Sequence, residues 1–97
     1  MMKNFLFLAI GFEKQTDTAM AAWEKWFESN ADKIVDKGAP TVSGRELTKS
    51  GTGELPLDDA AISGYMIVKA ADMDEAVKIA EGSPINHSLR IYETMTM

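Results

Sequence analysis

The fold is decided by residues 62–95, whose sequence is ISGYMIVKAADMDEAVKIAEGSPINHSLRIYETM. The apolar run from Ile62 to Ala70 predicts a buried strand. Asp72 and Glu75 have the spacing of an acidic capping box, so they predict the start of a helix directly after this strand. Gly82 predicts the end of that helix.

A further strand is predicted at Leu89 to Met95, beyond Pro84, which prevents the helix from continuing. Because side chains alternate along a strand, Leu89 and Ile91 share one face. Arg90 and Tyr92 share the opposite face, with Thr94. Residues 62–95 are therefore predicted to form a strand–helix–strand unit.

A second unit of this kind is predicted nearer the N-terminus, from Lys3 to Thr48. The unbroken apolar run Phe5 to Ile10 predicts a strand covered on both faces. Thr16 to Lys37 is predicted as a helix that stops at Gly38, and Pro40 to Thr48 as a weak edge strand. The inward stripe of the helix is expected to consist of Met20, Trp23, Phe27, Ala31 and Ile34, widened by Val35, with Trp26 at its edge.

The predicted element order, β-α-β-β-α-β, indicates one α+β domain covering residues 1–97, with turn material at 49–54 and irregular chain at 55–61. Right-handed crossovers place both helices on one face of a four-stranded antiparallel sheet, a ferredoxin-like fold. The other face would still carry large apolar side chains from the two apolar strands. Such a patch usually marks an interface, so we expect a homodimer in which two sheets face each other.

Composition limits the classes of partner. The net charge is −5 and no segment concentrates Lys or Arg, so neither nucleic acid nor an acidic membrane surface is an expected partner. The chain has no cysteine, which fits a cytoplasmic location and removes thiolate chemistry. Lys3 and the apolar run after it resemble a signal peptide, but the charged residues at 13–17 favour the strand interpretation.

The residues also resemble a known family. Gly64–Val68, Met73–Ala80, Pro84 and Leu89–Glu93 are similar to the C-terminal half of the YCII-related group, which includes the DGPF proteins. The resemblance implies a dimeric α/β barrel whose two sheets enclose a cavity. The chain has Asp58-Asp59-Ala60-Ala61 where the DGPF motif would stand, so the fold is carried over without a catalytic pair.

Five residues are candidates for ligand binding, and no residue is assigned to catalysis, a metal or a cofactor. Arg90 with Tyr92 could hold a carboxylate or enolate oxygen, although Arg90 could equally pair with Glu46 or Glu93 across strands. His87 is the only histidine and could act as a general base or be a surface residue. The complete candidate set is Arg45, Tyr65, His87, Arg90 and Tyr92.

Three functions are compatible with the sequence. The first is a homodimer that binds a small organic molecule in or near the barrel cavity. The second, which the resemblance to dimeric α/β barrels implies, is an enzyme of the isomerase, oxygenase or dehalogenase kind, in which His87 or Asp58 would move a proton and Arg90 or Tyr92 would stabilise an anion. The third is a structural module for assembly.

Overall fold

The computed structural model describes residues 2–12, 16–85 and 87–95. Within them, β2, β5, β1 and β6 form an antiparallel sheet in that order, and β3 and β4 form a separate hairpin. The elements are β1 (Lys3–Ile10), α1 (Asp17–Ser29), β2 (Ile34–Pro40), β3 (Arg45–Thr48), β4 (Gly51–Glu54), β5 (Ile62–Ala70), α2 (Met73–Glu81) and β6 (Ser88–Glu93). This α+β arrangement is compatible with a ferredoxin-like fold.

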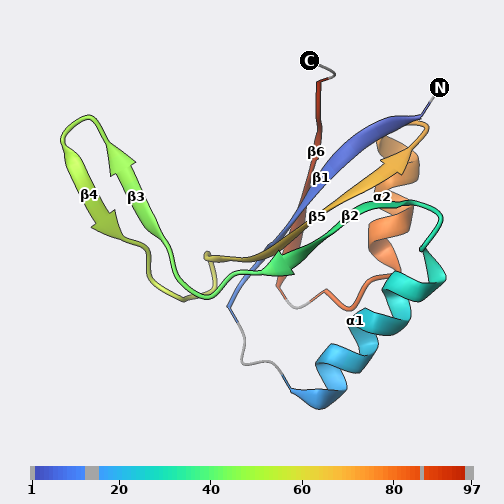
Figure 1. Cartoon of the computed structure of the whole chain (residues 1–97), viewed down its shortest axis with the longest axis horizontal. Coiled ribbons are helices and arrows are strands. Elements are labelled where there is room, and N and C mark those ends of the chain that lie inside the picture. Colours follow the sequence, from blue (N-terminus) through green and yellow to red (C-terminus); the bar gives the residue numbers. More distant parts are fainter. Residues whose placement is uncertain (1, 13–15, 86, 96–97) are drawn as a thin grey trace.

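One hydrophobic core lies between the helices and one face of the sheet (Figure 1). Phe5 and Phe7 of β1 and Val68 of β5 are fully buried in it. Both helices contribute to the same core, which shows that they cover the same sheet face. Their buried members are Trp26 from α1 and Ala76, Ile79 and Ala80 from α2.

The opposite face of the sheet, which we call the open face, has no helix over it. Its inner rows carry Leu6 and Leu8 of β1, paired with Ile67 and Tyr65 of β5. The two leucines and Ile67 are half-buried, and Tyr65 is exposed. Arg90 and Tyr92 complete these rows from β6. The predicted alternation therefore holds along β1 until a register shift at Ala9/Ile10, after which Ile10 is buried.

The first helix is shorter than predicted. It begins at Thr16, whose Oγ1 accepts from the Ala19 N–H at 3.1 Å, but it ends at Ser29 and not at Lys37. At Asn30 the side-chain Nδ2 donates to the Trp26 carbonyl at 2.9 Å, and the backbone then turns. Because an amide side chain competes with the backbone for its hydrogen bonds, Asn30 suits a helix end. Ile34 consequently starts β2.

The second strand also differs from the prediction, because β2 ends at Pro40 where a strand was predicted to begin. Gly38 does not stop a helix; it lies within β2 with φ +67, where the register with β5 is irregular. Its N–H donates to Asp36 Oδ1 at 2.8 Å. A positive φ suits glycine at a bulge as well as at a helix end, so the prediction that Gly38 stops a helix is wrong.

Residues 41–57 form a projecting segment that we call the arm. Its hairpin, β3 and β4, joins the end of β2 to the start of β5 and extends away from the sheet and helices (Figure 1). Residues 49–54, predicted as turn material, divide into a two-residue turn and strand β4. Strand β4 was not predicted, because Gly51 and Gly53 weaken its strand pattern. The irregular chain predicted at 55–61 is confirmed.

The elements of residues 62–95 agree closely with the prediction. Strand β5 has the predicted bounds, and β6 runs from Ser88 to Glu93. Asp72 Oδ1 accepts from the Glu75 N–H at 2.9 Å, which confirms the cap of α2. The helix ends before Gly82, whose backbone has a right-handed helical conformation with φ −79. No helix in the described residues is both long and apolar enough to cross a bilayer.

The two tryptophans exchange the positions expected from the sequence. Trp26, expected at the edge of the helix stripe, is 5% exposed and lies in the core. Its Nε1–H donates to the Ile79 carbonyl at 3.2 Å. Trp23, expected in the core, is half-buried and packs edge-on against Trp26 with ring centroids 5.8 Å apart. Relative to the predicted stripe, α1 is therefore rotated about its axis. In this orientation there is space beside Trp23.

Candidate binding cavity

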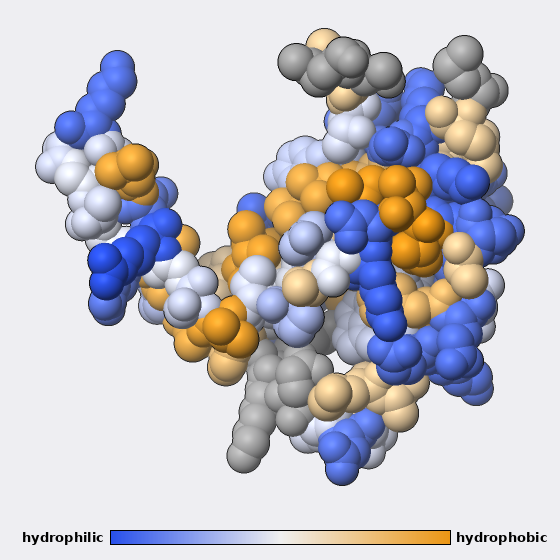
Figure 2. Space-filling model, in the orientation of Figure 1, coloured by the Kyte–Doolittle hydropathy of each residue, from blue (hydrophilic) through white to orange (hydrophobic). Residues whose placement is uncertain are grey.

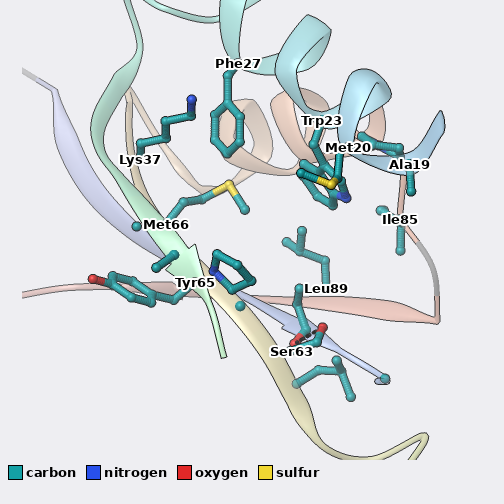
Figure 3. Close-up of a pocket in the computed structure, with 18 of the residues that line it drawn as sticks. Ala19, Met20, Trp23, Phe27, Lys37, Ser63, Tyr65, Met66, Ile85 and Leu89 are labelled. Carbon is teal, nitrogen blue, oxygen red and sulfur yellow. Dashed lines mark hydrogen bonds between the residues drawn. The ribbon is translucent and has the colours of Figure 1, made fainter. Parts of the chain in front are cut away.

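A cavity of about 370 Å³ lies between α1 and the sheet (Figure 3). Met20, Trp23 and Phe27 line it from the helix, and Met66 and Leu89 line it from the sheet. Figure 3 shows these side chains directed toward one another across a common space. Mainly apolar walls with a few polar groups are typical of small-molecule sites, and this volume lies within their usual range of about 300–1,000 Å³.

The polar side of the cavity is formed by Lys37 and Glu24. Lys37 Nζ lies 2.9 Å from Glu24 Oε1 and 5.0 Å from the centre of the Phe27 ring. Both charged side chains are about half exposed. An amine at the mouth of an apolar cavity can donate a hydrogen bond to an oxygen of a bound molecule. The cavity thus combines a large apolar surface with one cationic donor.

On the opposite side of the cavity, the polar groups are backbone atoms of the strands and one side-chain hydroxyl. Ser63 and Gly64 of β5 line it next to Ala9 of β1. The Ser63 hydroxyl donates to the Ala9 carbonyl at 3.3 Å. Since this hydroxyl already has a protein acceptor, it offers a bound molecule mainly its oxygen lone pairs.

Of the five residues proposed from the sequence, Tyr65 lines this cavity, and its exposed ring points away from it (Figure 3). Arg90 and Tyr92 are both exposed on the open face, on the other side of the sheet. Arg45 lies on the arm, opposite Glu54 in the hairpin. The structure therefore does not bring the five residues to one place.

Arg90 has neither of the two acidic partners considered for it. Its neighbour across the ladder is Leu8. Glu93 instead lies 3.7 Å from Lys3, and Glu46 is on the arm. Within the described residues Arg90 is therefore a cation on a mainly apolar face, two residues before Tyr92 in the same strand.

His87 lies near the start of β6 and has an acidic neighbour that the sequence did not indicate. His87 Nε2 is 3.3 Å from Asp59 Oδ1, with side chains 43% and 86% exposed. Asp58, considered from the sequence as a proton carrier, accepts from the Ala60 N–H at 3.0 Å and so stabilises a local turn. The imidazole also packs against Gly11, where any added Cβ would overlap it.

The residues that line the cavity were visible in the sequence but were interpreted only as core. Met20, Trp23 and Phe27 recur at three- and four-residue spacing, a pattern that a packed helix and a cavity wall produce equally. Lys37 was assigned to a helix end. Its position beside Glu24 depends on β2 returning next to α1, and no local pattern encodes that return.

The chain was compared with models of known protein families, with curated proteins and with solved structures, and none of them matches. Nor do the described residues contain a group of three or more His, Asp or Glu side chains placed to hold a metal ion.

Proposed function

We propose that this protein binds a small, mainly apolar organic molecule in the cavity under α1. The observation that carries the proposal is the cavity itself, with its aromatic and thioether walls and Lys37 at one side. The space is partly open to solvent and its walls are mainly apolar, so an apolar molecule that enters it would be removed from water together with those walls. A ligand with one oxygen-bearing group directed toward Lys37 suits the lining best.

The binding test uses a matched series of probes, namely naphthalene, 2-naphthol and 2-naphthoate, followed through the amide resonances of the cavity residues. We expect shifts confined to α1, β2, the adjoining parts of β1 and β5, and the start of β6. The naphthoate should bind most tightly, because its carboxylate can compete with Glu24 for Lys37. If no probe shifts these resonances, or if the shifts gather on the open face, the proposed site is wrong.

Two variants of α1, in each of which an alanine is replaced by phenylalanine, provide the control. Ala19 lines the cavity, whereas Ala21 is exposed and is not among the residues that line it. Ala19→Phe should fill the space and weaken probe binding at least tenfold, while Ala21→Phe should leave it unchanged. Equal affinities in both variants would contradict the assignment of the cavity as the site.

We further propose that two copies pair through their open faces, as a ferredoxin-like dimeric barrel of the YCII-related kind would, in the cytoplasm. Leu6, Leu8 and Ile67 support this, because they are large, apolar and only half-buried in the single chain. Burying each fully would contribute up to about 1.5–3 kcal/mol. In such a pair Arg90 and Tyr92 would lie at the interface between the two sheets.

A second candidate function is enzymatic, and the His87–Asp59 pair favours it. A carboxylate 3.3 Å from an imidazole nitrogen can orient the ring, as in many general-base pairs. However, Arg90 and Tyr92 lie on the face of the sheet opposite the cavity, and neither they nor His87 line it. Because a base and an anion holder must converge on one substrate, binding ranks above catalysis.

A further inference from the structure

We infer that the arm is a dimerisation element that packs against the body of a second copy of this chain. The inference rests on the proposed pairing through the open faces and deepens it. It starts from the exposure of the arm's large apolar side chains, which a hairpin in water would not favour. These side chains are Val42 (76% exposed), Leu47 (78%), Leu55 (48%) and Leu57 (48%).

The arm lacks the packing that normally stabilises a hairpin. Strands β3 and β4 pair only with each other and pack extensively on no other element. Figure 2 shows the arm standing clear of the body. A two-stranded hairpin alone is marginally stable in water, and stability needs further strands or another packed surface. Something outside the single chain must therefore supply that surface.

Two backbone hydrogen bonds anchor the arm at its base and neck. Its first residue, Thr41, donates its N–H to the Ser63 carbonyl at 3.0 Å, which extends the β2–β5 pairing beyond Pro40. At the neck, the Leu55 N–H donates to the Gly44 carbonyl at 3.0 Å. Both bonds direct the hairpin outward from the sheet (Figure 1). Its apolar side chains and the apolar open face of the same chain thus remain apart.

The area of the open face indicates why a dimer would use the arm. Four strands about 4.8 Å apart and about seven residues long, at about 3.3 Å per residue, present roughly 450 Å². A stable protein–protein interface buries about 800 Å² on each partner. The open face is therefore a small footprint for a stable interface, and an arm that contacts the partner would enlarge the surface that the dimer buries.

Charge also favours a second copy over a basic or acidic partner. The chain as a whole carries a net charge of −5. Within 41–57, however, the charges balance, since Arg45 and Lys49 are matched by Glu46 and Glu54. A neutral arm with exposed apolar side chains can approach an acidic protein without the like-charge repulsion that opposes association elsewhere on the surface.

The test removes the arm and leaves its neck intact. Replacing residues 45–54 with Asn-Gly connects Gly44 to Leu55, which the neck hydrogen bond already holds together. Because β3 and β4 pack extensively on no other described element, the far-UV CD spectrum should still show a folded domain. Sedimentation equilibrium from 1 to 500 µM should give a dimer for the full chain and a dissociation constant at least a hundredfold higher without the arm.

A point substitution avoids deletion altogether. Leu47→Glu at the exposed tip of the arm should weaken the dimer at least tenfold, whereas Val77→Glu, at an exposed apolar position on α2, should leave it unchanged. If the variant without the arm dimerises as tightly as the full chain, the role of the arm is overturned and the open-face dimer still stands. A full chain that stays monomeric at 500 µM would overturn both.

Discussion

Gly38 is the residue that allows the edge strand β2 to lie against β5. With φ +67 it occupies the left-handed region, and a Cβ there would overlap the Tyr65 carbonyl oxygen. Gly38→Ala should therefore lower the free energy of unfolding by about 2 kcal/mol or more, measured by urea denaturation. Gly53→Ala is the control, since nothing lies near its Cβ position, and it should change stability by less than about 0.5 kcal/mol.

Trp26 connects the two helices through a single hydrogen bond. Its indole N–H donates to the carbonyl of Ile79, which lies in the last turn of α2, where carbonyls lack an intrahelical partner. Trp26→Phe should cost about 1–3 kcal/mol of unfolding free energy, because it removes packing and leaves a buried acceptor unpaired. Trp23→Phe, at a half-buried position, should lower the unfolding free energy by less than half as much. Thermal or urea denaturation of both variants measures the difference.

At the scale of the element, α2 owes its start to a short-range hydrogen-bond pattern. Asp72 accepts from the Glu75 N–H, and Glu75 Oε1 in turn accepts from the Ala71 N–H at 3.3 Å. Asp72→Ala should destabilise the protein by about 1 kcal/mol, the usual loss for an N-cap. Asp74→Ala, also in the first turn, should cost about 0.5 kcal/mol or less. If chemical denaturation showed the same loss of unfolding free energy for both variants, charge alone, and not the cap, would stabilise this end of the helix.

At the scale of the whole molecule, the open face predicts that stability depends on protein concentration. Because association stabilises only the folded state, the melting temperature of the dimer should rise as the protein is concentrated. Ile67→Lys, in the middle of the open face, should abolish this dependence, while Val77→Lys on α2 should preserve it. Differential scanning calorimetry over a hundredfold concentration range measures both, and a constant melting temperature in the wild type would contradict the pairing.

The sequence by itself determined the elements whose signals are local. The apolar runs of β1 and β5 are strands because their length and composition leave no other buried structure for them. The cap at Asp72 depends on atoms three residues apart, so spacing alone predicts it. The inward and outward faces of β6 follow from the alternation of its side chains, and Leu89 and Ile91 do pack against the core.

Only the tertiary structure decided where the first helix ends, what Gly38 does and where the cavity lies. Residues 31–37 contain a helical apolar pattern, yet 31–33 form a turn and pairing of Ile34 with Val68 makes 34–37 strand, because a ladder to β5 outweighs a weak local preference. Lys37 then reaches Glu24, and His87 reaches Asp59, through contacts between segments distant in sequence. Such contacts depend on how the elements pack, which no periodicity within one element encodes.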